Sequence, residues 1–180
     1  RISYTKIAKL VGLSKQSIAL RISRMEKIGL ILGYKGLLNL SKLGYQYYRW
    51  HMRFSGNERK KFLEILEYFK VIPNSRWITE TKGFSDLMVG FVANNEMEAS
   101  ILIDKFTSNF GDYILDSHIA LVTRLVAFNR GYWLEKHNEP KSYIMIGEER
   151  PYSKPNKVEL DNLDIKIVKL LAQNARYSLR

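Results

Sequence analysis

The side chains best able to recognise another molecule are gathered between Ser14 and Lys35. A glutamine such as Gln16 can bond both edge atoms of adenine, and a lysine or arginine such as Lys15 or Arg21 can bond guanine or a phosphate. Further cations would contact the phosphate backbone and set affinity without reading sequence. The free N–H groups of a helix that begins at Ser14 could also hold a phosphate. The candidate contacts to double-stranded DNA are Ser14, Lys15, Gln16, Ser17, Arg21, Arg24, Lys27 and Lys35.

The spacing around these side chains predicts a helix-turn-helix. Ala8 lets two helices approach closely, and Gly12 can adopt the positive φ that a tight turn between helices requires. Ile18, six residues after Gly12, then belongs to the inner face of the second helix. The second helix is the one that would enter a DNA groove.

The ends of both helices are also marked in the sequence. Ser3 and Ser14 are suitable N-caps, and Gly29 is a suitable left-handed terminator of the second helix. Two short apolar runs follow, at residues 30–34 and 37–40. We expect these runs to form the two strands of a wing.

Positive charge is concentrated on the same part of the chain. The formal net charge is +11, and residues 1–44 contain nine of the 29 Lys and Arg but only Glu26 of the 18 Asp and Glu. This asymmetry suits a polyanionic partner such as nucleic acid. A solvated basic face would explain the charge alone, and it is the coincidence with the helix-turn-helix spacing that favours DNA.

Several classes of function lack the residues they need. Cys is absent, which excludes disulfides, Cys-based zinc sites and a thiol nucleophile. No apolar run approaches the ~20 residues of a membrane span, and no secretory signal opens the sequence. The three histidines lack metal-ligand spacing, and no Gly-rich phosphate loop or nucleophile motif is present. We therefore expect no catalytic residues, no metal, no cofactor and no membrane partner, and a cytoplasmic location.

From Tyr45 onward the pattern becomes that of an α+β domain. Helices are expected at residues 57–70 and 95–110, and strands at 45–54, 76–81, 86–93 and 114–128. The order βαββαβ predicts a ferredoxin-like fold, in which two helices cover one face of an antiparallel sheet. Apolar side chains on the other face would then need a partner. Candidates are alternating members of residues 77–78, 87–89 and 121–126.

The last fifty residues contain a linker and a further helix. Residues 131–159 hold scattered prolines among Glu, Lys and Asn, which is typical of a linker, with a short edge strand expected at 143–146. A helical stripe then begins at Leu160, and Asp161 and Asp164 have capping-box spacing.

The end of the chain repeats its beginning. Residues 176–179 align with residues 1–4, which gives a period of 175 residues. We expect from this repeat a longer parent protein built from tandem units, and the absence of an initial Met is consistent with a fragment. Residues 160–180 would then begin a second helix-turn-helix domain. A chance short match is the alternative explanation of the alignment.

These residues together resemble the Lrp/AsnC family of transcription regulators. The resemblance rests on Ile7-Ala8, Gly12-Leu13-Ser14, Ile18, Arg21-Ile22, Met25-Glu26, Gly29, Ile31, Gly33-Tyr34 and Lys42-Leu43-Gly44. It covers about residues 1–130, and Lys82-Gly83-Phe84-Ser85-Asp86 stands where the family usually has a Thr-Gly-x-x-Asp turn. Residues 160–178 look like the first helix of the family's DNA-binding domain. Lys6 departs from the family, which often has Glu there, and so does Lys82.

The resemblance implies a division into domains. Residues 1–44 would be a winged helix-turn-helix that lacks its first helix, and residues 45–130 a ferredoxin-like effector and dimerisation domain. It also implies a sequence-specific transcriptional regulator modulated by a small molecule such as an amino acid, bound near Gly83 and Asp86. Dimerisation through the sheet would give a homo-oligomer, or a pseudo-dimer within one tandem chain.

Two alternatives remain open at this point. An architectural DNA-binding protein without an effector would use the same basic residues. Some proteins that resemble this family are haem-pathway decarboxylases that use histidine and arginine, and His51, Arg53 and His118 could serve such an enzyme.

Overall fold

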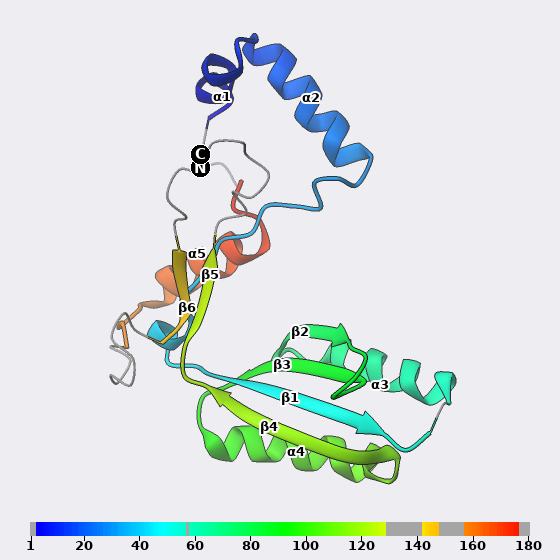
Figure 1. The fold of residues 1–180 in the computed structure, drawn as a ribbon. Helices are drawn as coiled ribbons and strands as arrows, with labels where there is room; N and C mark the ends of the chain where they lie inside the picture. The colour runs from blue at the N-terminus through cyan, green and yellow to red at the C-terminus, as the bar shows by residue number, and fades with distance from the viewer. Residues whose placement is uncertain (1–2, 57, 129–141, 148–156, 177–180) are drawn as a thin grey trace. The chain divides into compact units, whose positions relative to one another are not determined.

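A computed structural model describes residues 3–56, 58–128, 142–147 and 157–176 (Figure 1). The chain divides into two compact units. Residues 1–37 and 160–180 make up the first unit, and residues 38–159 make up the second. Most of the predicted linker at 131–159 lies outside the described residues.

The first unit contains the predicted helix pair, α1 (Tyr4–Val11) and α2 (Lys15–Lys27). Ser3 Oγ accepts a hydrogen bond from the Lys6 N–H at 3.2 Å and so caps α1. Gly12 follows α1 with φ 68°, and its backbone bends the chain directly into the cap of α2. The predicted corner is therefore confirmed, and glycine is needed there because side chains rarely tolerate that φ.

The core between these helices is small. Its buried side chains are Ala8, Ile18 and Ile22. Partly buried Tyr4, Ile7, Met25 and Ile31 pack around them. The chain leaves α2 through Gly29 at φ 72°, with the Leu30 N–H donating to the Met25 carbonyl at 2.9 Å, so Gly29 ends α2 as predicted.

The prediction that residues 30–34 and 37–40 form wing strands was wrong. Residues 30–39 have no strand, and Leu40–Leu43 form the 3-10 helix η1, which belongs to the second unit. The backbone of the segment after α2 finds other partners. The Tyr34 carbonyl accepts from the Ala175 N–H at 2.8 Å, and the Gly36 N–H donates to the Leu171 carbonyl at 2.9 Å.

Leu171 lies in the predicted C-terminal helix, α5 (Asn162–Gln173), and Ala175 comes just after this helix. The Asp161 carboxylate accepts from the Leu163 and Asp164 N–H groups, and the Asp164 carboxylate accepts from the Asp161 N–H. The capping box is thus confirmed. The apolar stripe of α5 is exposed, with Leu163 65% accessible.

The second unit is built on a four-stranded antiparallel sheet in the order β2-β3-β1-β4. Its strands are β1 (Gln46–Phe54), β2 (Ser75–Glu80), β3 (Leu87–Ala93) and β4 (Ile114–Val122). Two helices, α3 (Arg59–Val71) and α4 (Glu96–Phe110), pack on one face of this sheet (Figure 1). The short 3-10 helix η2 (Gly111–Tyr113) links α4 to β4. The predicted ferredoxin-like order is confirmed.

The face under the helices holds an aromatic core. Trp50 is 2% exposed and meets Phe106 edge-on at 4.9 Å between ring centroids, and Phe69 lies 4.7 Å from Phe106. Met52, Leu87 and Val89 are fully buried in the same cluster. Leu87 and Val89 therefore face the helices. Of the predicted open-face candidates, Trp77 is 60% exposed and Leu121 is 48% exposed.

The last predicted strand, residues 114–128, is broken in two. β4 ends at Val122, and β5 (Leu125–Phe128) pairs instead with β6 (Ser142–Ile146) in a separate antiparallel ribbon. This ribbon packs through Ile146 onto Tyr47 and Val92. The Gly147 N–H donates to buried Ser41 Oγ at 2.8 Å, which ties the ribbon to η1. The predicted short strand at 143–146 is confirmed, with β5 as its partner.

Candidate nucleic-acid interface

The orientation of α2 is set by two buried isoleucines. Ile18 and Ile22 are 5% and 8% exposed and point into the helix pair. Successive helical residues turn by about 100°, so the side opposite these isoleucines carries Gln16, Leu20 and Lys27. All three are exposed. The outer side of α2 is therefore free to meet another molecule.

Ser14 and Ser17 form the start of this helix. Ser14 Oγ accepts from the Ser17 N–H at 3.1 Å, and the two hydroxyl oxygens lie 2.9 Å apart. Ser17 is partly buried. These hydroxyls are thus engaged with each other, while the N–H groups of Lys15 and Gln16, in the first turn of α2, point out of the helix end as a potential anion site.

The predicted cations are distributed around α2 and beyond it. Lys15 and Arg21 lie on the two flanks of the buried stripe, and Arg24 and Lys27 lie in the last turn. All four are exposed, as is Lys35 in the irregular segment after α2. The structure therefore brings Lys15, Gln16 and Arg21 onto one accessible helix.

Leu20 is a residue that the candidate set of contacts omits. It is 74% exposed and follows Gln16 by one helical turn. An exposed apolar side chain in that position can contact the methyl group of thymine. The sequence could have indicated Leu20, because a spacing of four puts it on the same side of the helix as Gln16, away from Ile18.

The predicted effector turn lies in the second unit. Gly83 has φ 113° and an open surround, which suits a hairpin glycine. The Asp86 carboxylate accepts from the Phe54 N–H at 2.9 Å, and the Asp86 N–H donates to the Met52 carbonyl. Asp86 thus anchors the start of β3 to β1.

A cleft of about 650 Å³ opens beside Asp86. Its lining carries both signs of charge: Arg53, Arg59 and Lys82 are cationic, and Glu58, Glu80 and Asp86 are acidic. Arg59 and Glu80 form an exposed ion pair at 3.4 Å. Gly83 is not among the lining residues. A mixed lining of this kind can meet both ends of a zwitterion.

The two described histidines, His51 on β1 and His118 on β4, both lie beside the ring of Phe84. His51 and His118 are directly paired across these strands, and the Phe84 ring lies 5.8 Å from the His51 ring and 5.3 Å from the His118 ring. His118 Nε2 lies 3.1 Å from Asp116 Oδ2. Within the part of the chain that the structure describes, no three His, Asp or Glu side chains gather as metal ligands.

Comparison with known proteins adds independent observations. Residues 1–31 match a family model described as winged helix-turn-helix DNA-binding. The "Proline dehydrogenase transcriptional activator" of Rhodobacter capsulatus is 50% identical over 44 residues, which cover 24% of this chain and 29% of that protein. The chain therefore spans less than a third of the length of that relative.

Solved structures match a larger part of the chain. An AsnC family transcriptional regulator from Agrobacterium tumefaciens matches with a TM-score of 0.63 and 18% identity, covering 74% of this chain and 88% of that one. The chain has the fold of the AsnC/Lrp regulators. A transcriptional regulator from Neisseria meningitidis in complex with L-Met also matches, with a TM-score of 0.57 and 17% identity over 68% of this chain and 79% of that one.

The AsnC/Lrp fold confirms the resemblance and the α+β architecture expected from the sequence. None of the helices in the described ranges is long and apolar enough to cross a membrane. The residue assignments within the AsnC/Lrp fold, namely the DNA contacts on α2 and the effector turn at Gly83 and Asp86, stay predictions.

Proposed function

We propose that the chain is a sequence-specific DNA-binding transcriptional regulator whose α2 enters the major groove. The observation that carries this proposal is the exposed outer side of α2, with Gln16 and Leu20 opposite buried Ile18 and Ile22. A helix of this width fits the major groove and presents its first residues to base edges. The matched winged helix-turn-helix model over residues 1–31 supports the same conclusion.

The candidate contacts divide into two roles. Lys15, Gln16 and Arg21 are assigned to base edges, because they stand in the half of α2 nearest its start. Arg24, Lys27 and Lys35 are assigned to phosphates, which set affinity and salt dependence without reading sequence. Ser14 and Ser17 build the helix end that receives a phosphate.

The experiment first selects preferred duplexes from a random pool with the full chain. Binding to the selected duplex and to a scrambled one is then compared for two double variants, Lys15→Ala with Gln16→Ala and Arg24→Ala with Lys27→Ala. The first pair should lose preference for the selected duplex, by about 1–3 kcal/mol for each lost bidentate contact. The second should weaken binding to both duplexes equally and lower the slope of log affinity against log salt.

A matched control removes two cations from the second unit, with Lys70→Ala and Lys105→Ala. Both lysines are exposed on α3 and α4, so this variant should leave the sequence preference unchanged. If the two α2 variants lost affinity in the same way on both duplexes, the assignment of α2 to the groove would be wrong.

We further propose that an amino acid binds in the cleft beside Asp86 and modulates DNA binding. The carboxylate of the ligand would meet Arg53 or Lys82, and its ammonium group would meet Glu80 or Asp86. The complex of the Neisseria meningitidis regulator with L-Met supports an amino acid as the class of ligand. Gly83 would contribute the turn that positions Lys82.

The test screens the twenty amino acids by isothermal calorimetry, with Arg53→Gln as the variant and Arg49→Gln, outside the cleft lining, as its control. Binding by the wild type that Arg53→Gln alone abolishes would support the cleft. No heat from any of the twenty would favour the architectural alternative. Absorbance of a bound tetrapyrrole in the purified protein would favour the decarboxylase alternative.

Association through the sheet is proposed as well. Trp77 pairs with Gly90 and lies on the sheet face opposite the helices, where its side chain is 60% exposed. A large apolar side chain that is exposed in this way can mark an interface with another protein surface. We expect a homo-oligomer, or an intrachain pseudo-dimer in a tandem protein. Trp77→Glu should convert an oligomer to monomers in sedimentation velocity. Thr79→Glu is the matched comparison, because it adds the same charge to the same strand face but keeps the Trp77 side chain.

A further inference from the structure

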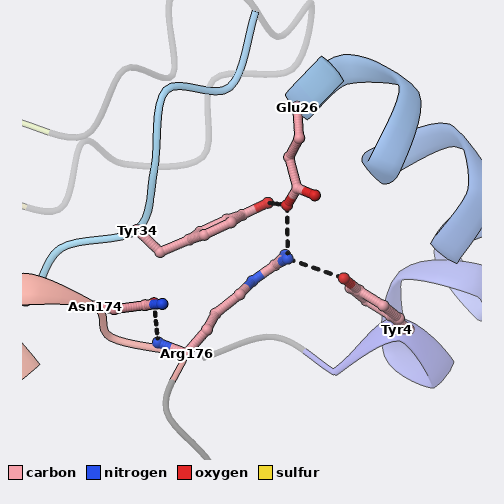
Figure 2. A network of polar contacts seen from close by, with 5 residues as sticks. All are labelled: Tyr4, Glu26, Tyr34, Asn174 and Arg176. Carbon is pink, nitrogen blue, oxygen red and sulfur yellow. Dashed lines mark hydrogen bonds and ion pairs between the residues drawn. The ribbon is translucent and has the colours of Figure 1, made fainter. Parts of the chain in front are cut away.

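Arg176 lies at the centre of a polar cluster in the first unit (Figure 2). Its Nη1 donates to the Tyr4 hydroxyl at 2.9 Å and to Glu26 Oε1 at 3.1 Å. The Tyr34 hydroxyl donates to the same Glu26 oxygen at 2.8 Å. The guanidinium carbon lies 3.4 Å from the centroid of the Tyr34 ring and 5.2 Å from that of Tyr4. We call Arg176 with Tyr4, Glu26 and Tyr34 the Arg176 clamp.

Arg176 contacts three separate pieces of chain. Tyr4 is the first residue of α1, Glu26 lies in the last turn of α2, and Tyr34 belongs to the irregular segment that follows. Burial, and next the hydrogen bond to Glu26, raises the pKa of the Tyr34 hydroxyl. Both effects favour the protonated hydroxyl that donates to Glu26.

Backbone contacts fix the register of the segment that carries Arg176. Asn174 Oδ1 accepts from the Arg176 N–H at 2.9 Å, and the Tyr34 carbonyl accepts from the Ala175 N–H. The Leu171 carbonyl accepts from the Gly36 N–H, and a Cβ at Gly36 would lie 3.1 Å from that oxygen. Residues 171–176 thus fit closely against residues 34–36.

Apolar packing contributes little to this attachment. Leu163, Ile167 and Leu170 on α5 are 65%, 45% and 43% exposed. The apolar cluster around Ile18 and Ile22 draws on residues of α1, α2 and the segment after α2. In the described part of the chain, the polar contacts of residues 171–176 are therefore what fastens this segment to the helix-turn-helix.

We propose that residues 171–176 are a docking segment for the helix-turn-helix, and that Arg176 is the positioning residue that fixes the angle between α1 and α2. Three buried side chains give this helix pair a core too small to determine the angle by packing alone. The clamp connects the start of α1 to the end of α2, so it restrains the pair at the points farthest from the Gly12 corner. The C-terminal segment and the DNA-reading helix are thereby coupled.

Arginine is required in this position for two physical reasons. Its planar guanidinium can lie flat on the Tyr34 ring while its fixed N–H groups reach two oxygens at once. A lysine keeps the charge but offers a single ammonium group that cannot lie flat on the ring. Arg176→Lys should therefore recover only part of the clamp.

The test measures amide hydrogen exchange of the full chain by mass spectrometry. Arg176→Gln and Glu26→Gln should each lower protection in α1, α2 and residues 171–176 by about tenfold, and Arg176→Lys by less. Lys169→Gln removes the same charge from an exposed position on α5 and should change nothing. Unchanged protection in the sheet unit shows that the effect of each variant is confined to the first unit. Unchanged exchange of α1 and α2 in Arg176→Gln would overturn the proposal.

Charge exchange provides a second, independent arm. Arg176→Glu and Glu26→Arg should each break the clamp, and the double variant should restore protection in part because the pair is re-formed with reversed charges. If protection returned only when the two single variants were mixed, the docking would occur between copies, and docking within one chain would be refuted.

A DNA arm rests on the proposed function. Arg176→Gln should weaken binding to the selected duplex more than to the scrambled one, because the angle of α2 determines the fit in the groove. Equal loss on both duplexes would refute positioning. A wild-type chain without DNA binding would refute the proposed function and leave the exchange experiments on the clamp intact.

Discussion

The two units of this chain are stabilised in different ways. The sheet unit buries a continuous cluster of rings, in which Trp50, Phe69 and Phe106 meet edge-on or tilted within about 6 Å. The helix-turn-helix unit buries only Ala8, Ile18 and Ile22 among its described residues, and it depends on serine caps, a turn glycine and the Arg176 clamp. Apolar burial contributes free energy in proportion to area, at about 25 cal/mol per Å². The sheet unit, or scaffold, is therefore held by apolar packing, and the helix-turn-helix unit, called the reading unit below for its proposed role, is held by directional contacts.

The sheet unit should lose most from a cavity. Phe106 is fully buried and contacts Trp50, Phe69 and Phe110, so Phe106→Ala should lower the free energy of unfolding of this unit by about 3–5 kcal/mol. Urea denaturation followed by circular dichroism measures the change. Ile101→Ala, also on α4 but 59% exposed, should cost less than about 0.5 kcal/mol. Similar losses in both variants would contradict the ring core.

The small core of the reading unit gives the next largest effect. Ile18→Ala should cost about 2–4 kcal/mol in the helix pair, because Ile18 is one of its three buried side chains. Hydrogen exchange should show α1 and α2 opening while β1 and β3 stay protected. The matched control is Leu20→Ala on the same helix, where the side chain is 74% exposed. Equal loss of protection in the sheet would mean that the two units unfold together.

The Gly12 corner tests the backbone of the reading unit. Gly12 has φ 68°, and a Cβ there would meet no other atom within 4 Å, so Gly12→Ala costs backbone strain rather than a clash, about 1–2 kcal/mol. Exchange rates in α1 and α2 report the loss. Gly56→Ala, which meets nothing within 4 Å and lies outside the left-handed region, is the control. No difference between the two would remove the strain argument.

The smallest effect is expected from an acid in the sheet unit. The Asn94 backbone N–H, followed by the Asn94 side chain, holds the pKa of Glu98 below its usual value. This contribution is fully present above the ordinary glutamate pKa and is lost as pH falls through the lowered one. Glu98→Gln should flatten the acid limb of a urea-midpoint curve below about pH 4.5, by less than about 1 kcal/mol.

Asp104→Asn removes a carboxylate from the same helix and is the matched comparison. Acid curves for wild type and Glu98→Gln that ran parallel would contradict the assigned role of the Asn94 hydrogen bonds.

Periodicity and end signals made most of the fold predictable. The alternation in residues 45–54 and the helical stripe of residues 95–110 arise because each element has one face in the core. The caps Ser3, Ser14 and Asp161 bond to backbone N–H groups three residues further along the chain, so the local sequence is enough to predict them. The exposed face of α2 followed from the spacing of Ile18 and Ile22.

The features that could not be predicted depend on distant partners. Residues 30–34 are strand-like in composition, but the segment's backbone groups at Tyr34 and Gly36 pair with residues 175 and 171, which no local pattern reveals. The break in residues 114–128 arises because β5 leaves β1 and pairs with β6. The Arg176 clamp joins residues up to 172 positions apart, so only the folded structure brings it together.

The tryptophans of this chain are unevenly distributed between the two units. Trp50, Trp77 and Trp133 all belong to the residue range of the sheet unit, and the sequence of the reading unit has none. None of the indole fluorescence therefore arises from a tryptophan within α1 or α2. Because α1 and α2 contain no tryptophan, their unfolding must be followed through tyrosine or backbone signals.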